Sequence, residues 1–101
     1  MTVKSASRAL DILSLLTRRR GRLTFAEMEA ALGYPKASLH GLLQTMTQAN
    51  WLDYDSATRG YALGIRVWEA GAASLAMVPL WSRAKPFLER VRDQTTETVQ
   101  L

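Results

Sequence analysis

The sequence predicts a mainly α protein with a small β-hairpin. Apolar residues recur at helical spacing over residues 5–17, 24–32 and 35–49, and a period of two replaces this spacing over residues 51–63. The letters SATRG at 56–60 interrupt the period-two segment and are typical of a hairpin turn. Helical patterns return afterwards, so the expected order is three helices, a hairpin, a linker helix and a further C-terminal helix.

The positive charge lies in the first two-thirds of the chain. Residues 1–66 hold nine Lys or Arg and five Asp or Glu, a net charge of +4, whereas residues 67–101 hold four of each. Basic character confined to one part of a chain favours a nucleic-acid-binding face there. A solvated basic surface without a partner is the alternative that charge alone leaves open.

Composition restricts the chemistry and the compartment. The chain contains no cysteine, which excludes disulfides and thiolate metal sites, and His40 is its single histidine. A metal site or a nucleophile–base pair is therefore not expected. No apolar run approaches the ~20 residues of a membrane span, and the first residues lack the apolar core of a signal peptide. We expect a cytoplasmic protein with no membrane partner, no cofactor and no catalytic site.

The first helix is expected to begin at a cap formed by Ser5 or Ser7 and to run to about Thr17. The basic run RRRGR at 18–22 then ends it, with Gly21 as the expected stop. Arginines are favourable at the negative end of a helix dipole, and direct phosphate contact is compatible with that role. The positions expected to face the core are Ala6, Ala9, Leu10, Leu13 and Leu16, with Ile12 beside them.

The second helix begins with a capping box. Thr24 and Glu27 have the S/T-x-x-E spacing, and Leu23 and Met28 lie at the two positions of a hydrophobic staple. Gly33 is expected to end this helix about two turns later. Leu23 and its neighbours could also form a brief strand before the cap.

Pro35 is expected to be the first residue of the third helix, where proline loses no helical hydrogen bond. The helix should run to about Ala49, with Asn50 as a left-handed cap. Its inner apolar stripe consists of Leu39, Leu42, Leu43 and Met46. Its outer face carries only small or hydrogen-bonding side chains, namely Ala37, Ser38, His40, Gly41, Gln44 and Thr45. A face this short and weakly charged is expected to lie against a partner.

Two short helices joined by a tight glycine-containing turn, the second with such a face, are typical of a helix-turn-helix, and a hairpin directly after them makes it winged. The outer face fits the major groove of DNA. The residues able to exchange hydrogen bonds with base edges are Ser38, His40, Gln44 and Thr45. Lys36 at the helix start is expected to meet a phosphate. Gly41 either lets the backbone approach DNA closely or has no role, and His40 is either a groove contact or a solvated side chain.

The hairpin, or wing, is expected to approach DNA through its tip. Arg59 lies there and is the candidate for a minor-groove or phosphate contact. Asp53 and Asp55 lie on one strand face, where they would repel DNA. No neighbouring residues suggest that these two carboxylates form a catalytic pair.

Residues 64–77 form the expected linker helix, which is apolar or small nearly all round. Pro79 begins the last helix, and Pro86 inside it implies a kink or a restart. The final TVQL is typical of the opening of a strand. The pattern stops there, so the chain is expected to be a fragment of a longer protein.

The linker helix is expected to mediate a homodimer or a higher oligomer, because one helix-turn-helix contacts few base pairs and specificity normally needs two copies. Trp68 and Leu75 would supply apolar anchors, and small residues such as Ala72 would let a partner helix come close. The alternative is that this helix covers its own domain or the missing C-terminal domain.

The sequence resembles the IclR family of bacterial transcriptional regulators in the order and spacing of five segments: SRALDILSLL, LTFAEMEAALGYPKASLHGLLQTM, NWLDYD, GYALG and AGAA. The later AKPFLERV and TETVQL are similar to the entry to that family's ligand-binding domain. The resemblance implies a winged helix-turn-helix DNA-binding domain over residues 1–63, a linker helix over 64–78 and the start of an effector-binding domain over 79–101. It also implies a ligand-responsive repressor or activator whose small-molecule effector binds the missing part.

Two positions depart from the family's pattern. Gly41 stands where the family usually has an arginine, which suggests a different operator. Asn50 stands where the family usually has a glycine, which is a tolerable cap substitution. The alternative to DNA binding is a winged-helix protein-interaction module, and the positive charge of residues 1–66 favours DNA.

Overall fold

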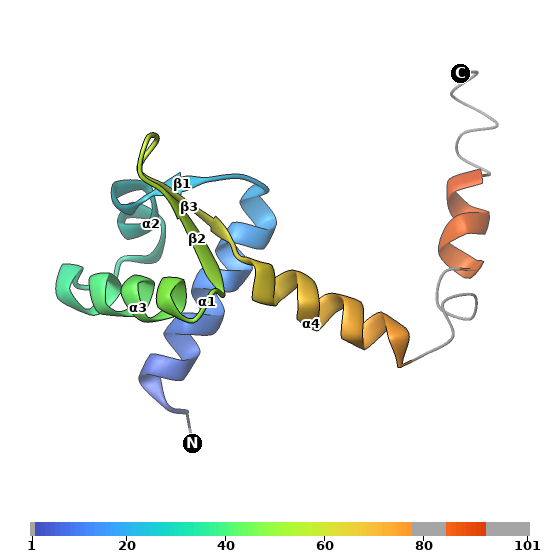
Figure 1. Cartoon of the computed structure of the whole chain (residues 1–101), viewed down its shortest axis with the longest axis horizontal. Coiled ribbons are helices and arrows are strands. Elements are labelled where there is room, and N and C mark those ends of the chain that lie inside the picture. The colour runs from blue at the N-terminus through green and yellow to red at the C-terminus, as the bar shows by residue number, and fades with distance from the viewer. Residues whose placement is uncertain (1, 78–84, 93–101) are drawn as a thin grey trace. The chain divides into compact units, whose positions relative to one another are not determined.

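The computed structural model describes residues 2–77 and 85–92, and the chain divides into two compact units, Met1–Trp68 and Glu69–Leu101. Figure 1 shows the elements along the chain. They are α1 (Lys4–Arg19), β1 (Leu23–Thr24), α2 (Phe25–Leu32), α3 (Lys36–Gln48), β2 (Leu52–Asp55), β3 (Gly60–Leu63) and α4 (Ile65–Ala76). Residues 85–92 are also helical. The predicted fold class, mainly α with a small hairpin, is confirmed.

The sheet has three antiparallel strands in the order β1-β3-β2. β2 and β3 form the predicted hairpin, in which Leu52 lies opposite Leu63. β1 adds to the other edge of β3, where Leu23 pairs with Tyr61. The brief strand suggested before the second helix is therefore present.

An apolar core lies between α1, α2, α3 and the sheet. Its buried residues are Ile12, Leu15, Leu16, Leu23, Met28, Leu39, Leu43, Met46 and Leu52. Burying a side chain of this size contributes about 1.5–3 kcal/mol. The core therefore holds all three helices and the root of the hairpin in fixed relative positions.

Most of the predicted inner face of α1 is confirmed, but Leu10 is not part of it. Ile12 and Leu16 are buried and Ala9 and Leu13 pack against the core, but Leu10 is 64% exposed. α1 is apolar on two sides, because Leu10 and Ile12 point about 200° apart around a helix. Periodicity reveals both sides but does not show which of them the other elements cover.

The ends of α1 also differ from the prediction. Val3, rather than a serine, is the N-cap residue, and no side chain caps the helix. Arg20, rather than Gly21, is the left-handed residue at the C-terminal end, with a φ of 51°. Its backbone N–H donates to the Leu16 carbonyl oxygen and closes the last turn.

The start of α2 follows its sequence signals. The Thr24 hydroxyl accepts a hydrogen bond from the Glu27 N–H, and the Glu27 carboxylate accepts one from the Thr24 N–H. The bond from the Thr24 backbone, followed by that from the Thr24 side chain, lowers the pKa of Glu27. Gly33 ends α2 in the left-handed conformation, with a φ of 71°. The capping box therefore sets the start of α2, and Gly33 sets the turn that leads into α3.

α3 begins one residue later than predicted. Pro35 is its N-cap residue, and the helix proper starts at Lys36 because the ψ of Pro35, 143°, is extended. The helix ends at Gln48, and Asn50 is left-handed as predicted, with a φ of 67°. The chain is thereby turned from α3 into β2.

Backbone hydrogen bonds join the end of α3 to the start of α4. Trp51 N–H donates to the Met46 carbonyl at 2.9 Å, and Gly64 N–H donates to the Trp51 carbonyl at 2.9 Å. Arg66 N–H donates to the Asn50 carbonyl at 3.0 Å. We call this group of bonds the Gly64 junction. It ties the first turn of α4 to the segment that follows α3.

The predicted linker helix is present as α4, and none of its twelve residues is buried. The boundary between the two compact units falls inside it, after Trp68. The division into domains at residues 63 and 78 stays a prediction.

Residues 85–92 are helical and include Pro86. The predicted kink or restart at Pro86 stays a prediction. The predicted helix start at Pro79 and the predicted strand at TVQL lie outside the described residues. No helix in the described part of the chain is long and apolar enough to cross a membrane.

We expect Gly64→Ala to lower the free energy of unfolding by about 1–3 kcal/mol, the usual cost of overpacking. A Cβ at residue 64 would lie 2.4 Å from the Asn50 carbonyl oxygen and 2.8 Å from the Trp51 carbonyl carbon, both rigid backbone atoms. The measurement is urea unfolding followed by circular dichroism. Gly41→Ala is the matched control, because a Cβ there meets nothing within 4 Å. Equal stability of Gly64→Ala and the parent would contradict the expected clash.

Candidate nucleic-acid interface

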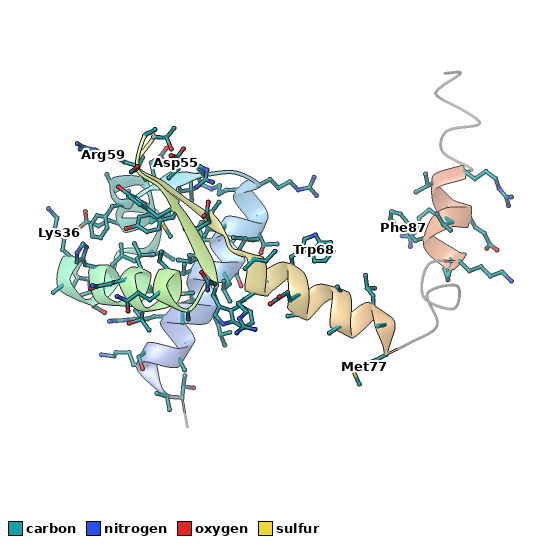
Figure 2. All side chains as sticks on the ribbon, in the orientation of Figure 1. Lys36, Asp55, Arg59, Trp68, Met77 and Phe87 are labelled. Carbon is teal, nitrogen blue, oxygen red and sulfur yellow. The ribbon has the colours of Figure 1, made fainter. Side chains whose placement is uncertain are left out.

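α3 has one face in the core and the opposite face exposed. Leu39 and Leu43 are fully buried, and Met46 is 8% exposed. The exposed positions predicted to meet DNA are Lys36, Ala37, His40, Gly41, Gln44 and Thr45. In Figure 2, Lys36 projects from the N-terminal end of α3. The structure therefore brings these six predicted residues onto one exposed surface.

Ser38 is half-buried and is engaged with α1. Its hydroxyl accepts a hydrogen bond of 2.8 Å from the Arg8 guanidinium, which lies 4.7 Å from the centre of the Tyr34 ring. The Tyr34 hydroxyl donates in turn to the Asp11 carboxylate, and this bond raises the pKa of Tyr34. The network ties the start of α3 to α1. The Ser38 hydroxyl still has its own proton to donate to a partner.

Arg8 is a candidate phosphate contact that the sequence patterns did not single out. Its guanidinium is held beside the first turn of α3, close to the helix end that attracts anions. The contact with Ser38 spans 30 positions of the chain, so no local pattern reveals it. The signal for Arg8 in the sequence is its position as a cation between the apolar residues Ala6 and Ala9 of the first helix.

A concave surface lies between α3, the start of α2 and the hairpin. It has a volume of about 580 Å³ and is lined by Thr24, Phe25, Ala26, His40, Tyr54, Thr58, Arg59 and Tyr61. A second hollow of about 260 Å³ is lined by His40, Gln44, Thr47, Gln48, Tyr54 and Tyr61. The two hollows share His40 and both tyrosines, so the outer face of α3 and the hairpin tip belong to one continuous surface.

Aromatic contacts set the shape of this surface. The rings of Phe25 and His40 meet edge to face with their centres 5.8 Å apart. The rings of Tyr54 and Tyr61 lie 4.7 Å apart across the hairpin. Burial, with a smaller contribution from Tyr54, raises the pKa of Tyr61, so its hydroxyl stays neutral and able to donate. His40 is exposed, but its ring is oriented by Phe25.

Arg59 lies at the tip of the hairpin and is exposed (Figure 2). Its backbone is left-handed, with a φ of 59°. Asp55 holds the turn before it, accepting hydrogen bonds from the Ala57 N–H at 3.0 Å and from the Thr58 hydroxyl at 3.1 Å. The positive charge of Arg59 therefore stands on a turn with internal hydrogen bonds.

Asp53 is paired with a cation that the sequence assigned to the end of a helix. The Arg22 guanidinium forms an ion pair of 2.5 Å with the Asp53 carboxylate and also donates to the carbonyl oxygens of Asp53 and Gly60. Arg22 therefore compensates the charge of Asp53, and the expectation that the two aspartates repel DNA stays a prediction. Arg22, the residue directly before β1, thus links the start of β1 to the hairpin.

Gly41 lies in the middle of α3, and a Cβ there would meet nothing within 4 Å. Packing inside the protein therefore does not require glycine at this position. A glycine in a helix interior costs about 1 kcal/mol relative to alanine. Both alternatives drawn from the sequence, close approach to DNA and no role, stay predictions.

The side chains of this surface are suited to binding a partner through hydrogen bonds and positive charge. Among residues 2–77 and 85–92, no three His, Cys, Asp or Glu side chains are grouped to hold a metal ion. The surface offers amide, hydroxyl and imidazole groups on one helix, with cations at the helix start and at the hairpin tip. A winged helix-turn-helix with such a surface defines a DNA-binding class of protein.

A family model described as the IclR helix-turn-helix domain matches residues 5–56, just over half of the chain. The chain belongs to the IclR family. The resemblance seen in the sequence is thus confirmed.

Curated relatives and solved structures agree with this assignment. The chain is 27% identical over 99 residues to the HTH-type transcriptional regulator XynR of Escherichia coli, covering 98% of this chain and 39% of that protein. It matches the crystal structure of an IclR transcriptional regulator from Alicyclobacillus acidocaldarius with a TM-score of 0.77 and 27% identity, over 90% of this chain and 37% of that one. The repressor BlcR of Agobacterium tumefaciens matches with a TM-score of 0.69 and 29% identity, over 91% of this chain and 37% of that one.

These relatives are transcriptional regulators, and this chain spans well under half of their length. The chain carries the helix-turn-helix domain of the IclR family.

Proposed function

We propose that this domain recognises a specific double-stranded DNA operator with the outer face of α3. The observation that carries the proposal is the exposed polar face directly opposite the buried Leu39 and Leu43. α3 contains no Asp or Glu, so nothing on it repels the phosphates. The major groove of B-DNA admits an α-helix and displays a distinct donor and acceptor pattern for each base pair.

The contacts divide into two kinds by chemistry. Gln44, His40 and Thr45 have short hydrogen-bonding groups suited to base edges, and Ser38 keeps a proton to donate. Ala37 and Gly41 have small or no side chains, so that the backbone of α3 can come close to the DNA. Lys36, Arg59 and Arg8 supply phosphate contacts that position the helix. This division follows from the exposure of these side chains and from the cations at the two ends of the surface.

The domain is further proposed to act as a homodimer through α4. Trp68 is 72% exposed and Leu75 is 48% exposed, and Ala72 lies between them on the same side of the helix. Apolar side chains this exposed in a helix are typical of a face that a partner covers. The exposed Leu10 side of α1 is a second region that a partner copy could cover.

In the longer protein we propose a ligand-responsive repressor or activator that works in the bacterial cytoplasm. A small-molecule effector would bind the effector domain, for which residues 79–101 are the proposed start. This proposal is supported by the family membership and by bacterial relatives that are transcriptional regulators.

We expect Gln44→Ala to weaken binding to the cognate operator by about 1–3 kcal/mol and to leave binding to unrelated DNA nearly unchanged, because a base-edge contact carries specificity. The operator is first selected from genomic fragments that the purified protein retains. Affinities are then measured by fluorescence anisotropy on both DNAs. Gln48→Ala, the same change one turn later, is the control and should cost less. Equal losses on both DNAs would show that Gln44 does not read bases.

Lys36→Ala and Arg59→Ala should each weaken binding to every DNA and reduce the slope of log affinity against log salt by about one, because each removes one phosphate contact. The slope is obtained from affinities at four or more salt concentrations. Arg18→Ala removes the same charge from the end of α1 and should change the slope less. An unchanged slope for either variant removes that residue from the phosphate contacts.

Trp68→Glu combined with Leu75→Glu should convert a dimer into a monomer, because it places two charges on the proposed apolar interface. The mass in solution is measured by sedimentation equilibrium. Ala70→Glu adds a charge on another side of α4 and should leave the dimer intact. A parent that is monomeric at concentrations where it binds operator tightly, or a double variant that stays dimeric, would rule out the α4 dimer.

A further inference from the structure

We infer that Asp55 is a positioning residue for DNA binding: its carboxylate folds the tip of the hairpin so that Arg59 points toward DNA. The inference rests on the proposed DNA contact of Arg59. It reverses the role expected of Asp55 from charge alone, which was that of a group repelling DNA.

Both oxygens of the Asp55 carboxylate are used inside the turn. Oδ1 accepts a hydrogen bond from the backbone N–H of Ala57 at 3.0 Å, two residues ahead. Oδ2 accepts one from the hydroxyl of Thr58 at 3.1 Å, three residues ahead. An aspartate that bonds the backbone two residues on replaces a backbone hydrogen bond of the turn. The carboxylate therefore fixes the chain between the end of β2 and Arg59.

The other end of the turn is fixed at Gly60. This residue pairs with Asp55 on β2 and with Thr24 on β1, and its carbonyl oxygen accepts a hydrogen bond from Arg22 at 3.1 Å. Arg59 lies between these two fixed points in the left-handed region, with a φ of 59°. A non-glycine residue keeps such a conformation only where its surroundings impose it.

Positioning and charge predict opposite signs for the loss of this carboxylate. If Asp55 acted only through its charge, removing it would strengthen binding to DNA, because one repulsion would be lost. If Asp55 positions Arg59, removing its oxygens weakens binding, because the cation no longer stands in place. Asp55→Asn separates the two further, since it removes the charge but keeps an oxygen for the Ala57 N–H and a polar group beside Thr58.

The first arm of the experiment uses NMR on the whole chain without DNA. In Asp55→Ala we expect Arg59 to lose the strong intraresidue amide-to-α-proton NOE that marks a left-handed residue, and the Ala57 amide to exchange faster with solvent. Asp55→Asn should keep both signals. Ser56→Ala, which changes another exposed side chain of the same turn, is the matched control. An unchanged Arg59 and Ala57 in Asp55→Ala would overturn the inference whether or not DNA binds.

The second arm measures affinity and salt slope on the selected operator. Asp55→Ala should weaken binding by the same factor as Arg59→Ala, and the double variant should be no weaker than Arg59→Ala alone, within about twofold. Asp55→Asn should bind nearly as the parent does. Thermal unfolding of each variant verifies that the domain is folded at the temperature of the measurement.

Three results in the second arm would overturn the inference. The first is tighter binding by both Asp55→Ala and Asp55→Asn. The second is additive losses for Asp55→Ala and Arg59→Ala, which would show that the two residues act independently. The third is unchanged binding by Arg59→Ala. In that case Gln44→Ala, measured in the same series, decides whether α3 still recognises DNA, so the proposed function is judged separately.

Discussion

Leu39 and Leu43 of α3 have no exposed side-chain surface, and their burial against the core decides which side of this helix faces solvent. Truncating a buried leucine typically costs about 2–5 kcal/mol, which is a large part of the stability of a domain this small. Rotation of α3 about its axis would expose these side chains and bury polar ones. The placement of His40 and Gln44 on the surface is therefore a consequence of packing on the other side of the helix.

The Gly64 junction connects the end of α3 to the first turn of α4. Backbone hydrogen bonds from Trp51, Gly64 and Arg66 connect the end of α3, the start of the hairpin and the first turn of α4. Backbone atoms leave no room for a Cβ at Gly64, so the junction depends on a glycine at this position.

Both aspartates of the hairpin are engaged by other groups of the protein. Arg22 compensates Asp53, and Asp55 is occupied by hydrogen bonds within the turn. Arg59 then carries the positive charge of the tip on an exposed side chain. A hairpin whose own sequence holds two aspartates and one arginine can in this way still present a cation to a polyanion.

The sequence by itself determined the helices, the hairpin, the capping box at Thr24, the left-handed residues Gly33 and Asn50, and the two faces of α3. Each of these depends on residues within a few positions of one another, so spacing and residue type are sufficient. Only the tertiary structure decided that Leu10 of α1 stays outside the core while Leu15 is buried in it. It also decided that Arg8 reaches Ser38, 30 positions away, and that Arg22 reaches Asp53, 31 positions away. Such contacts depend on how separate elements pack, and that packing is settled by the whole core at once.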